Sequence, residues 1–175
     1  ARDRPEDLGR AMAGIRRETS RMAGLVDDLL LLARLDEHRP LTREAVDLTE
    51  VVFAAIDAAT TVEPNRPIRV KIGDVIMVEG DAGRLRQVVD NLLTNVRAHT
   101  SAGTGCEVEL TTDGHDAVLT VTDGGLGVAP GDLDHLFERF YRVDDARARS
   151  TGGTGLGLAI VDAIDKQDTA TARRA

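Results

Sequence analysis

The sequence is poor in the residues that mark disulfide-stapled, membrane-spanning or nucleic-acid-binding proteins. It has one cysteine in 175 residues, so no intrachain disulfide can form, and a reducing, cytoplasmic compartment is expected. Unbroken apolar runs, such as residues 29–33, are far shorter than the roughly twenty residues of a membrane span, and no signal peptide is recognisable. The net charge of -8 argues against a nucleic-acid surface, which needs a dense basic patch.

Aromatic residues are almost as scarce. They make up 2% of the chain, and three of the four, Phe137, Phe140 and Tyr141, fall in one short segment whose flanks are rich in glycine. Aromatic anchors between glycine hinges predict a mobile lid, because the rings can dock the segment while the glycines let it swing. The alternative is a small satellite core. With 42% hydrophobic residues, the chain can bury a core in one domain plus an extension.

Glycine, in contrast, is concentrated where it can bind an anion. Residues 152–158 read GGTGLGL, with Gly153, Gly155 and Gly157 at every second position before an apolar helix. Glycines leave backbone N–H groups free to close around an anion, and the first turn of a helix adds its positive dipole end. The pattern predicts a phosphate cradle, although a flexible surface loop remains open for this motif taken alone.

A second glycine pattern follows an expected strand over 118–121. It consists of Asp123 followed by Gly124, Gly125 and Gly127. A carboxylate at a strand end, beside glycines that admit a flat ligand, can accept a hydrogen bond from an exocyclic amine such as that of adenine. The alternative is a hairpin turn at the Asp-Gly pair.

An amphipathic helix is expected over residues 84–100. Its apolar face is formed by six residues, Leu85, Val88, Val89, Leu92, Leu93 and Val96. Asn91 and Asn95 are four residues apart and share a helix face, so their amide oxygens can approach one metal ion or its waters. Because asparagine is a poor helix former, two of them within a helix need a reason beyond helix stability.

Taken in order, the segments NLLTN (91–95), DGGLG (123–127), LFERFYRVD (136–144) and GGTGLGL (152–158) resemble the ATP-binding domain of bacterial sensor histidine kinases. Residues 18–37 are similar to the second helix of that family's dimerisation and phosphoacceptor domain. The resemblance implies transfer of the γ-phosphoryl group of ATP to a histidine, with Mg²⁺ as cofactor, in two-component signal transduction. The protein then contributes mainly positioning and electrostatic stabilisation.

The resemblance also implies the roles of individual residues. Asn91 and Asn95 belong to the Mg²⁺ site, Asp123 reads adenine, and Arg142 reaches the nucleotide tail. The expected catalytic residues are Asn91, Asn95 and Arg142. The expected nucleotide-binding residues are Asn91, Asn95, His99, Asp123, Gly125, Gly127, Arg139, Arg142, Gly153, Thr154, Gly155, Leu156 and Gly157.

The expected fold is α+β, a two-layer α/β sandwich of the Bergerat ATP-binding type preceded by a long N-terminal helix. Leu8, Ile15, Met22 and Leu29 recur every seven residues, as in a bundle helix that needs a partner. Further helices are expected over 47–61, capped by Asp47 or Thr49, and over 154–166. Strands are expected over 68–72, 75–78, 107–111 and 117–121, and the last two are expected to form a hairpin around Asp113-Gly114. The strands are expected to pack against the helices 84–100 and 154–166.

Two departures from the family pattern shape the functional hypothesis. None of His38, His99, His115 and His135 has the family's acceptor context, so residues 1–40 are expected to be a partial dimerisation domain without the acceptor histidine. The chain is then expected to act on a separate histidine-containing protein, and through it on a response regulator. Residues 41–175 are expected to be the kinase domain without its last two strands, with an open sheet edge and marginal stability.

A further difference concerns nucleotide affinity. Ala98 stands where the family commonly has Lys or Arg, and loss of a charge-assisted contact weakens binding about ten- to a hundredfold. We therefore expect weak nucleotide binding, unless the neighbouring Arg97, about a third of a turn away, compensates.

Two other functions remain open from the sequence. The chain could be a degenerate, non-catalytic module whose N-terminal stripe forms a homodimer or regulates a complete kinase, in which case it binds no nucleotide. The third candidate is an ATPase clamp, as in DNA gyrase. The hydrolases of this superfamily carry a glutamate at the position of Asn91, and an amide cannot deprotonate water, so direct hydrolysis is disfavoured.

Overall fold

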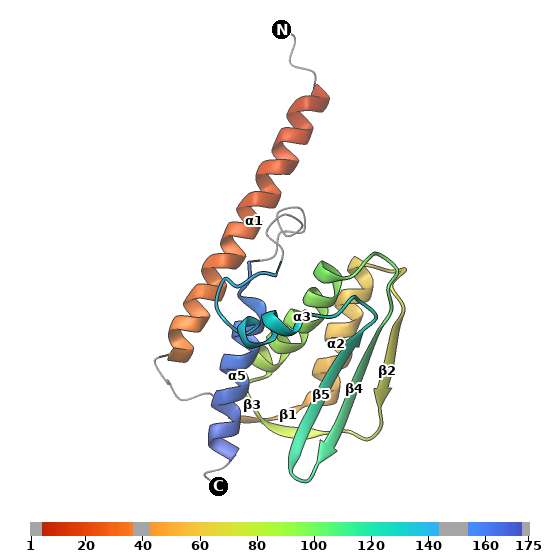
Figure 1. Ribbon diagram of the computed structural model, residues 1–175, viewed down its shortest axis with the longest axis vertical. Coiled ribbons are helices and arrows are strands. Elements are labelled where there is room, and N and C mark those ends of the chain that lie inside the picture. The colour runs from red at the N-terminus through yellow and green to blue at the C-terminus, as the bar shows by residue number, and fades with distance from the viewer. Residues whose placement is uncertain (1–4, 37–42, 144–153, 173–175) are drawn as a thin grey trace.

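The computed structural model describes residues 5–36, 43–143 and 154–172. Figure 1 shows a long helix, α1 (Pro5–Asp36), standing beside an α/β body in which helices lie against a sheet. The other elements are β1 (Glu44–Asp47), α2 (Leu48–Val62), β2 (Ile68–Ile72), β3 (Met77–Gly80), α3 (Ala82–His99), β4 (Cys106–Asp113), β5 (Asp116–Asp123), the 3-10 helix η1 (Pro130–His135) and α5 (Gly157–Ala172). The predicted α+β class with a long N-terminal helix is confirmed.

A side-chain cap fixes the start of each helix that covers the sheet. Asp47 Oδ1 accepts a hydrogen bond from Glu50 N at 3.0 Å at the start of α2, and Asp81 caps α3 in the same way. Of the two caps predicted for α2, Asp47 is therefore the correct one. Thr49 Oγ1 instead accepts a hydrogen bond from Ile76 N at 3.0 Å.

The strands form two sheets. β4 and β5 form the antiparallel hairpin that the sequence predicts, turning at Gly114 with a φ of 62°, and β2 pairs with β4 in parallel, which gives the order β2-β4-β5. β1 and β3 form a separate antiparallel pair. The sequence does not predict β1, and β3 begins at Met77, two residues later than expected.

The main core lies between the β2-β4-β5 sheet and the helices α2 and α3. Val52 of α2, Val89 of α3 and Val108 of β4 are each 1% exposed or less. Leu93 and Leu110 belong to the same buried cluster. Both helices therefore bury one apolar face against the strands, which fixes how α3 is rotated about its axis.

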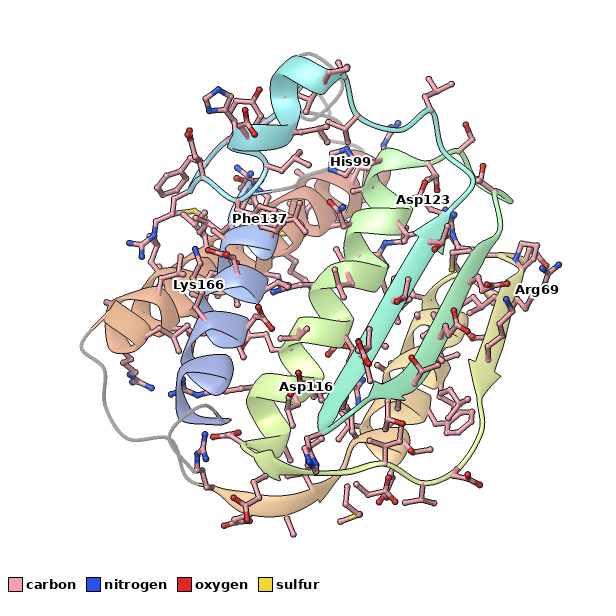
Figure 2. The ribbon with its side chains drawn as sticks, turned by 60° about the horizontal axis from the view of Figure 1, so that its bottom comes forward. Arg69, His99, Asp116, Asp123, Phe137 and Lys166 are labelled. Carbon is pink, nitrogen blue, oxygen red and sulfur yellow. The ribbon has the colours of Figure 1, made fainter. Side chains whose placement is uncertain are left out.

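A second core joins α5 to α1 and α3. Its members are buried apolar residues of α1 and of segment 156–164: Leu32, Leu35, Leu156, Ile160 and Ile164. The prediction that this last helix packs on the strands is wrong, because α3 lies between it and the sheet (Figure 2). The helix also begins at Gly157, three residues later than expected, because Gly155 has a φ of 72° and is not helical.

The long helix α1 has two apolar faces rather than one stripe. Leu32 is buried against α5, whereas Leu8, Ile15 and Met22 are 60% to 64% exposed. The exposed row continues along much of the helix, and an unburied apolar row of this kind marks an interaction surface. No helix of the described residues is both long enough and apolar enough to cross a bilayer.

Candidate functional site

Asp123, the last residue of β5, lies at the same end of the molecule as His99, the last residue of α3 (Figure 2). Asp123 Oδ1 accepts a hydrogen bond from Gly125 N at 2.7 Å. The chain then runs into η1 rather than into a partner strand, so the hairpin alternative for this motif is wrong. The Asp123 side chain is exposed, and its second oxygen has no hydrogen-bond partner among the described residues.

The turn after Asp123 packs closely against the C-terminal end of α3. A Cβ atom on Gly125 would lie 2.7 Å from Asp123 Oδ1 and 3.1 Å from the methyl carbon of Thr100, the C-cap of α3. Gly124 N donates a hydrogen bond to Gly105 O at 3.2 Å. A side chain at position 125 would therefore displace the Asp123 carboxylate and press on Thr100, so glycine at this position keeps Asp123 in place. Gly127 has a φ of 72° and open space around it.

The two asparagines lie on the face of α3 that is turned away from the sheet. Asn91 comes two positions after the buried Val89, and Asn95 comes two positions after the buried Leu93. Two positions correspond to about 200° around the helix, so both asparagines lie opposite the buried face. Asn91 Nδ2 donates a hydrogen bond to Gly157 O at 3.3 Å. The Asn95 amide is partly exposed and has no hydrogen-bond partner in the described part of the chain. His99, on the same face, is exposed.

The second glycine motif meets the aromatic segment through its backbone. Gly155 O accepts a hydrogen bond from Phe140 N at 2.9 Å. Gly155 has a φ of 72°, and a Cβ atom there would lie 2.9 Å from Phe140 C and 3.0 Å from Tyr141 O. Next to it, Thr154 Oγ1 accepts a hydrogen bond from Leu156 N at 3.3 Å, and Leu156 is buried. Gly153, also expected here, lies outside the described residues.

The aromatic segment is held by polar contacts more than by burial. Phe137 and Phe140 are 50% and 55% exposed, which contradicts the satellite-core alternative. Tyr141 Oη donates a hydrogen bond to Asp132 Oδ1 at 2.6 Å, and this bond raises the pKa of the tyrosine. The segment is thus docked on η1 and on the Gly155 backbone, with the two phenylalanine rings about half in solvent and the Tyr141 ring beside His135.

Histidine and arginine side chains accompany this segment. His135 Nδ1 lies 2.8 Å from Glu138 Oε1, and this hydrogen bond raises the pKa of the histidine. Arg142 Nη2 is buried and has no hydrogen-bond partner among the described residues. Arg139 already has an interaction. A buried guanidinium nitrogen without a partner is costly unless a ligand pairs with it, so Arg142 is the better candidate for an anion contact.

Two cavities lie away from these motifs. One, of about 330 Å³, is lined by the opposite side of α3, including Arg97, and by Ala58 and Val62 of α2. The other, of about 380 Å³, lies beside β1. Arg97 therefore faces α2, whereas Asn91 faces α5, so Arg97 does not take the place of the basic residue missing at Ala98. Thr100 is a contact of the site that the sequence patterns do not indicate, whereas Phe140 belongs to the predicted aromatic segment but meets Gly155 through its backbone.

The two glycine motifs thus both contact α3, one along its length and the other at its C-terminal end. Gly157 meets this helix at Asn91, and Gly125 meets it at Thr100, nine residues further along. At 1.5 Å per residue, these two contacts are about 13 Å apart along the axis, and Asn95 lies between them. No group of three or more His, Cys, Asp or Glu residues in the described ranges could hold a metal ion, so any metal here would rely on the amides.

Comparisons with known proteins agree with this geometry. Residues 80–173 match the family described as histidine kinase-, DNA gyrase B-, and HSP90-like ATPase. The probable sensor histidine kinase TcrY of Mycobacterium tuberculosis is 43% identical over 170 residues, which cover 97% of this chain and 36% of TcrY. Sensor histidine kinase TrcS of the same organism is 42% identical, over 94% of this chain and 33% of TrcS. The chain thus spans about a third of the length of these relatives.

Solved structures show the same similarity. The mycobacterial sensor histidine kinase MprB aligns with a TM-score of 0.63 and 30% identity, over 73% of this chain and 80% of that one. Full-length ShkA, in complex with AMPPNP, aligns with a TM-score of 0.71 and 27% identity, over 90% of this chain and 34% of that one. The chain therefore belongs to the family of histidine kinase-, DNA gyrase B- and HSP90-like ATPases, and it carries the ATP-binding catalytic domain found in sensor histidine kinases.

Proposed function

We propose that this chain binds ATP and Mg²⁺ along the face of α3 that is turned away from the sheet and transfers the γ-phosphoryl group to a histidine of a separate phosphoacceptor protein. The observation that carries the proposal is the convergence of both glycine motifs on α3, through the Asn91–Gly157 hydrogen bond and the Thr100–Gly125 contact. The ShkA structure, a similar chain in complex with AMPPNP, supports the nucleotide class.

The base and the phosphates are assigned to opposite ends of this face. Asp123 accepts a hydrogen bond from the exocyclic amine of adenine, with Gly125 and Gly127 as the floor of the base pocket and His99 at its wall. At the other end, the phosphates are assigned to the backbone N–H groups of 154–157 and the first turn of α5, together with Gly153, which lies outside the described residues. The hydrogen bond from Leu156 N to Thr154 Oγ1 already shapes the described part of this turn.

The residues present fit a magnesium ion held partly by substrate. Mg²⁺ commonly keeps several waters and takes only one or two protein ligands plus phosphate oxygens, so Asn91 and Asn95 suffice. In the described part of this region, the Asn95 amide and the buried Arg142 Nη2 have no hydrogen-bond partner, so both are free to meet a ligand. When bound, the ion would offset the charge of the phosphate oxygens. Arg142 would pair with a terminal phosphate and help to hold it in position.

The acceptor is assigned to another polypeptide. His115 lies in the β4–β5 turn, eight residues along β5 from Asp123, which is about 26 Å in an extended strand. His135 is paired with Glu138, and His99 belongs to the nucleotide site itself. None of these three carries the acceptor sequence context, and the phosphorylated partner would in turn supply a response regulator.

A homodimer is the proposed assembly for α1. The exposed row formed by Leu8, Ile15, Met22 and Val26 is 52% to 64% exposed and has the seven-residue repeat of a helix bundle. A second copy of α1 offers the same row in return, as a two-fold interface requires.

Phosphotransfer from labelled ATP tests the proposal. The chain is mixed with a histidine kinase fragment that carries the acceptor helix, with and without Mg²⁺. We expect acid-labile label on the fragment, none on this chain, and loss of transfer in Asp123→Ala. Labelling of this chain alone would contradict transfer in trans, and nucleotide binding without transfer to any acceptor fragment would favour a regulatory module.

A further inference from the structure

Arg66 is the most deeply buried charged side chain among the described residues whose role the proposed function leaves unexplained. The residue is 8% exposed, and it follows α2 in the short connection to β2. Burial of an arginine is unfavourable unless its N–H groups all find partners. Its surroundings therefore indicate what it holds in place.

All five N–H donors of Arg66 are engaged. Two of these hydrogen bonds go to the Glu63 carboxylate, one from Nε at 2.6 Å and one from Nη2 at 3.4 Å. The other three go to the loop after α3: Nη1 to Thr100 Oγ1 and to Thr104 O, both at 2.7 Å, and Nη2 to Ser101 O at 3.4 Å. Glu63 orients the guanidinium group of Arg66, and the guanidinium group in turn holds the loop that follows α3.

The same loop forms the back of the proposed adenine pocket. The methyl carbon of Thr100 lies 3.1 Å from the Cβ position of Gly125, and the methyl carbon of Thr104 lies 3.2 Å from that of Gly124. These two glycines directly follow Asp123. A shift of the loop would therefore move the turn that places the Asp123 carboxylate.

We propose that Arg66 is a positioning residue for adenine recognition: it clamps residues 100–104 against Gly124 and Gly125 and thereby sets the position of Asp123. Arg66 contacts Thr100 and Thr104 on one side of the loop, and the glycine turn contacts their methyl groups on another. This role rests on the proposed nucleotide site, yet it concerns a residue that lies outside that site.

The clamp also explains why arginine is needed here. Two nitrogen atoms of the planar Arg66 guanidinium group donate to three loop acceptors that lie in different directions. A lysine ammonium has only three donors, and all three start from one nitrogen atom. Arg66→Lys keeps the charge and should recover only part of the function. Thr100→Val keeps the bulk against Gly125 and removes the hydroxyl that Arg66 binds.

A double-mutant cycle on nucleotide binding tests the inference. Dissociation constants for ATP and GTP are measured in Mg²⁺ for the wild type, Arg66→Ala, Thr100→Val and the double variant, with Lys71→Ala as a control. Lys71 forms an exposed ion pair with Glu107 at 2.7 Å, so its loss removes the same charge without touching the loop. GTP has an acceptor where ATP has the exocyclic amine, so the ATP to GTP preference reports the placement of Asp123.

We expect Arg66→Ala to bind ATP at least about tenfold more weakly and to lose most of its preference over GTP, with Lys71→Ala unchanged. The double variant should be little worse than Arg66→Ala alone, because both changes release the same loop. Should Arg66→Ala not fold, the cycle uses Arg66→Lys. An unchanged ATP to GTP ratio with only a lower melting temperature would overturn the inference. A wild type that binds neither nucleotide would overturn the proposed function as well.

Discussion

Replacing Gly155 by alanine tests how the aromatic segment docks on the phosphate cradle. The new Cβ would lie 2.9 Å from Phe140 C, 3.0 Å from Phe140 Cα and 3.0 Å from Tyr141 O. All three are backbone atoms, so no side-chain rotation can relieve the overlap. Alanine also disfavours the left-handed φ of 72° at this position.

The expected destabilisation follows from these two effects. A left-handed residue other than glycine costs about 1–2 kcal/mol, and overpacking of a closely packed site adds about 1–3 kcal/mol. We therefore expect Gly155→Ala to lower the free energy of unfolding by about 2–5 kcal/mol. Release of residues 140–141 would relieve the overlap, but it breaks the Phe140 N to Gly155 O hydrogen bond and should also weaken ATP binding.

Gly114→Ala is the matched control. Gly114 has a similar φ of 62° in the β4–β5 turn, and nothing lies within 4 Å of its Cβ position. The free energy of unfolding of Gly114→Ala should fall only by the cost of the left-handed backbone, about 1–2 kcal/mol, and this variant should bind nucleotide as the wild type does. Urea unfolding and ATP titration of both variants provide the measurements. Equal destabilisation and equal ATP affinity in the two variants would refute the docking of residues 140–141 on Gly155.

Four further substitutions probe other contacts. Asn95→Ala should change the free energy of unfolding by less than about 0.5 kcal/mol, because the Asn95 amide has no partner in the described structure. It should nevertheless weaken Mg²⁺-dependent ATP binding, and an ATP affinity equal to that of the wild type would contradict the role assigned to Asn95. Ile160→Ala should lower the free energy of unfolding in urea by about 2–5 kcal/mol, because the Ile160 side chain is 0% exposed. A much smaller decrease, as for a substitution on the surface, would mean that α5 is not packed in the core. NMR titration should show that the raised pKa of His135 falls in Glu138→Gln, because the hydrogen bond to the carboxylate is lost. In the wild type, this pair stabilises the folded state at a pH below the usual histidine pKa, and the stabilisation is lost as the pH rises through the raised pKa. Ile15→Glu should lower the dimer fraction in sedimentation, and an unchanged monomer–dimer balance would exclude the exposed row of α1 as the contact.

Local signals in the sequence predict the helices and the hairpin. The apolar period of α3, the Asp47 cap of α2 and the Asp-Gly turn at Gly114 depend on neighbours within a few residues, so the sequence suffices for them. β1 escapes prediction because four residues, Glu44–Asp47, show no clear alternation and pair only with the distant β3.

Tertiary contacts explain the other differences. The packing of α5 on α3 instead of on the strands cannot be read from its own apolar residues, which fit either partner. Arg66 is an ordinary arginine in sequence terms, because its loop partners lie 34 to 38 residues away. The motifs predict which residue types gather at the site, whereas the loop that holds Asp123 emerges only from the fold.

Calorimetric titration of the wild type and Asp123→Ala with ATP in Mg²⁺ shows whether the glycine motifs, Asp123 and the α3 asparagines bind one nucleotide together. We expect saturable, one-to-one binding by the wild type, with a dissociation constant above the submicromolar range because of Ala98, and loss of binding in the Asp123 variant. No binding by the wild type at millimolar ATP, or equal binding by both proteins, would contradict the claim that the glycine motifs, Asp123 and the α3 asparagines form one nucleotide site.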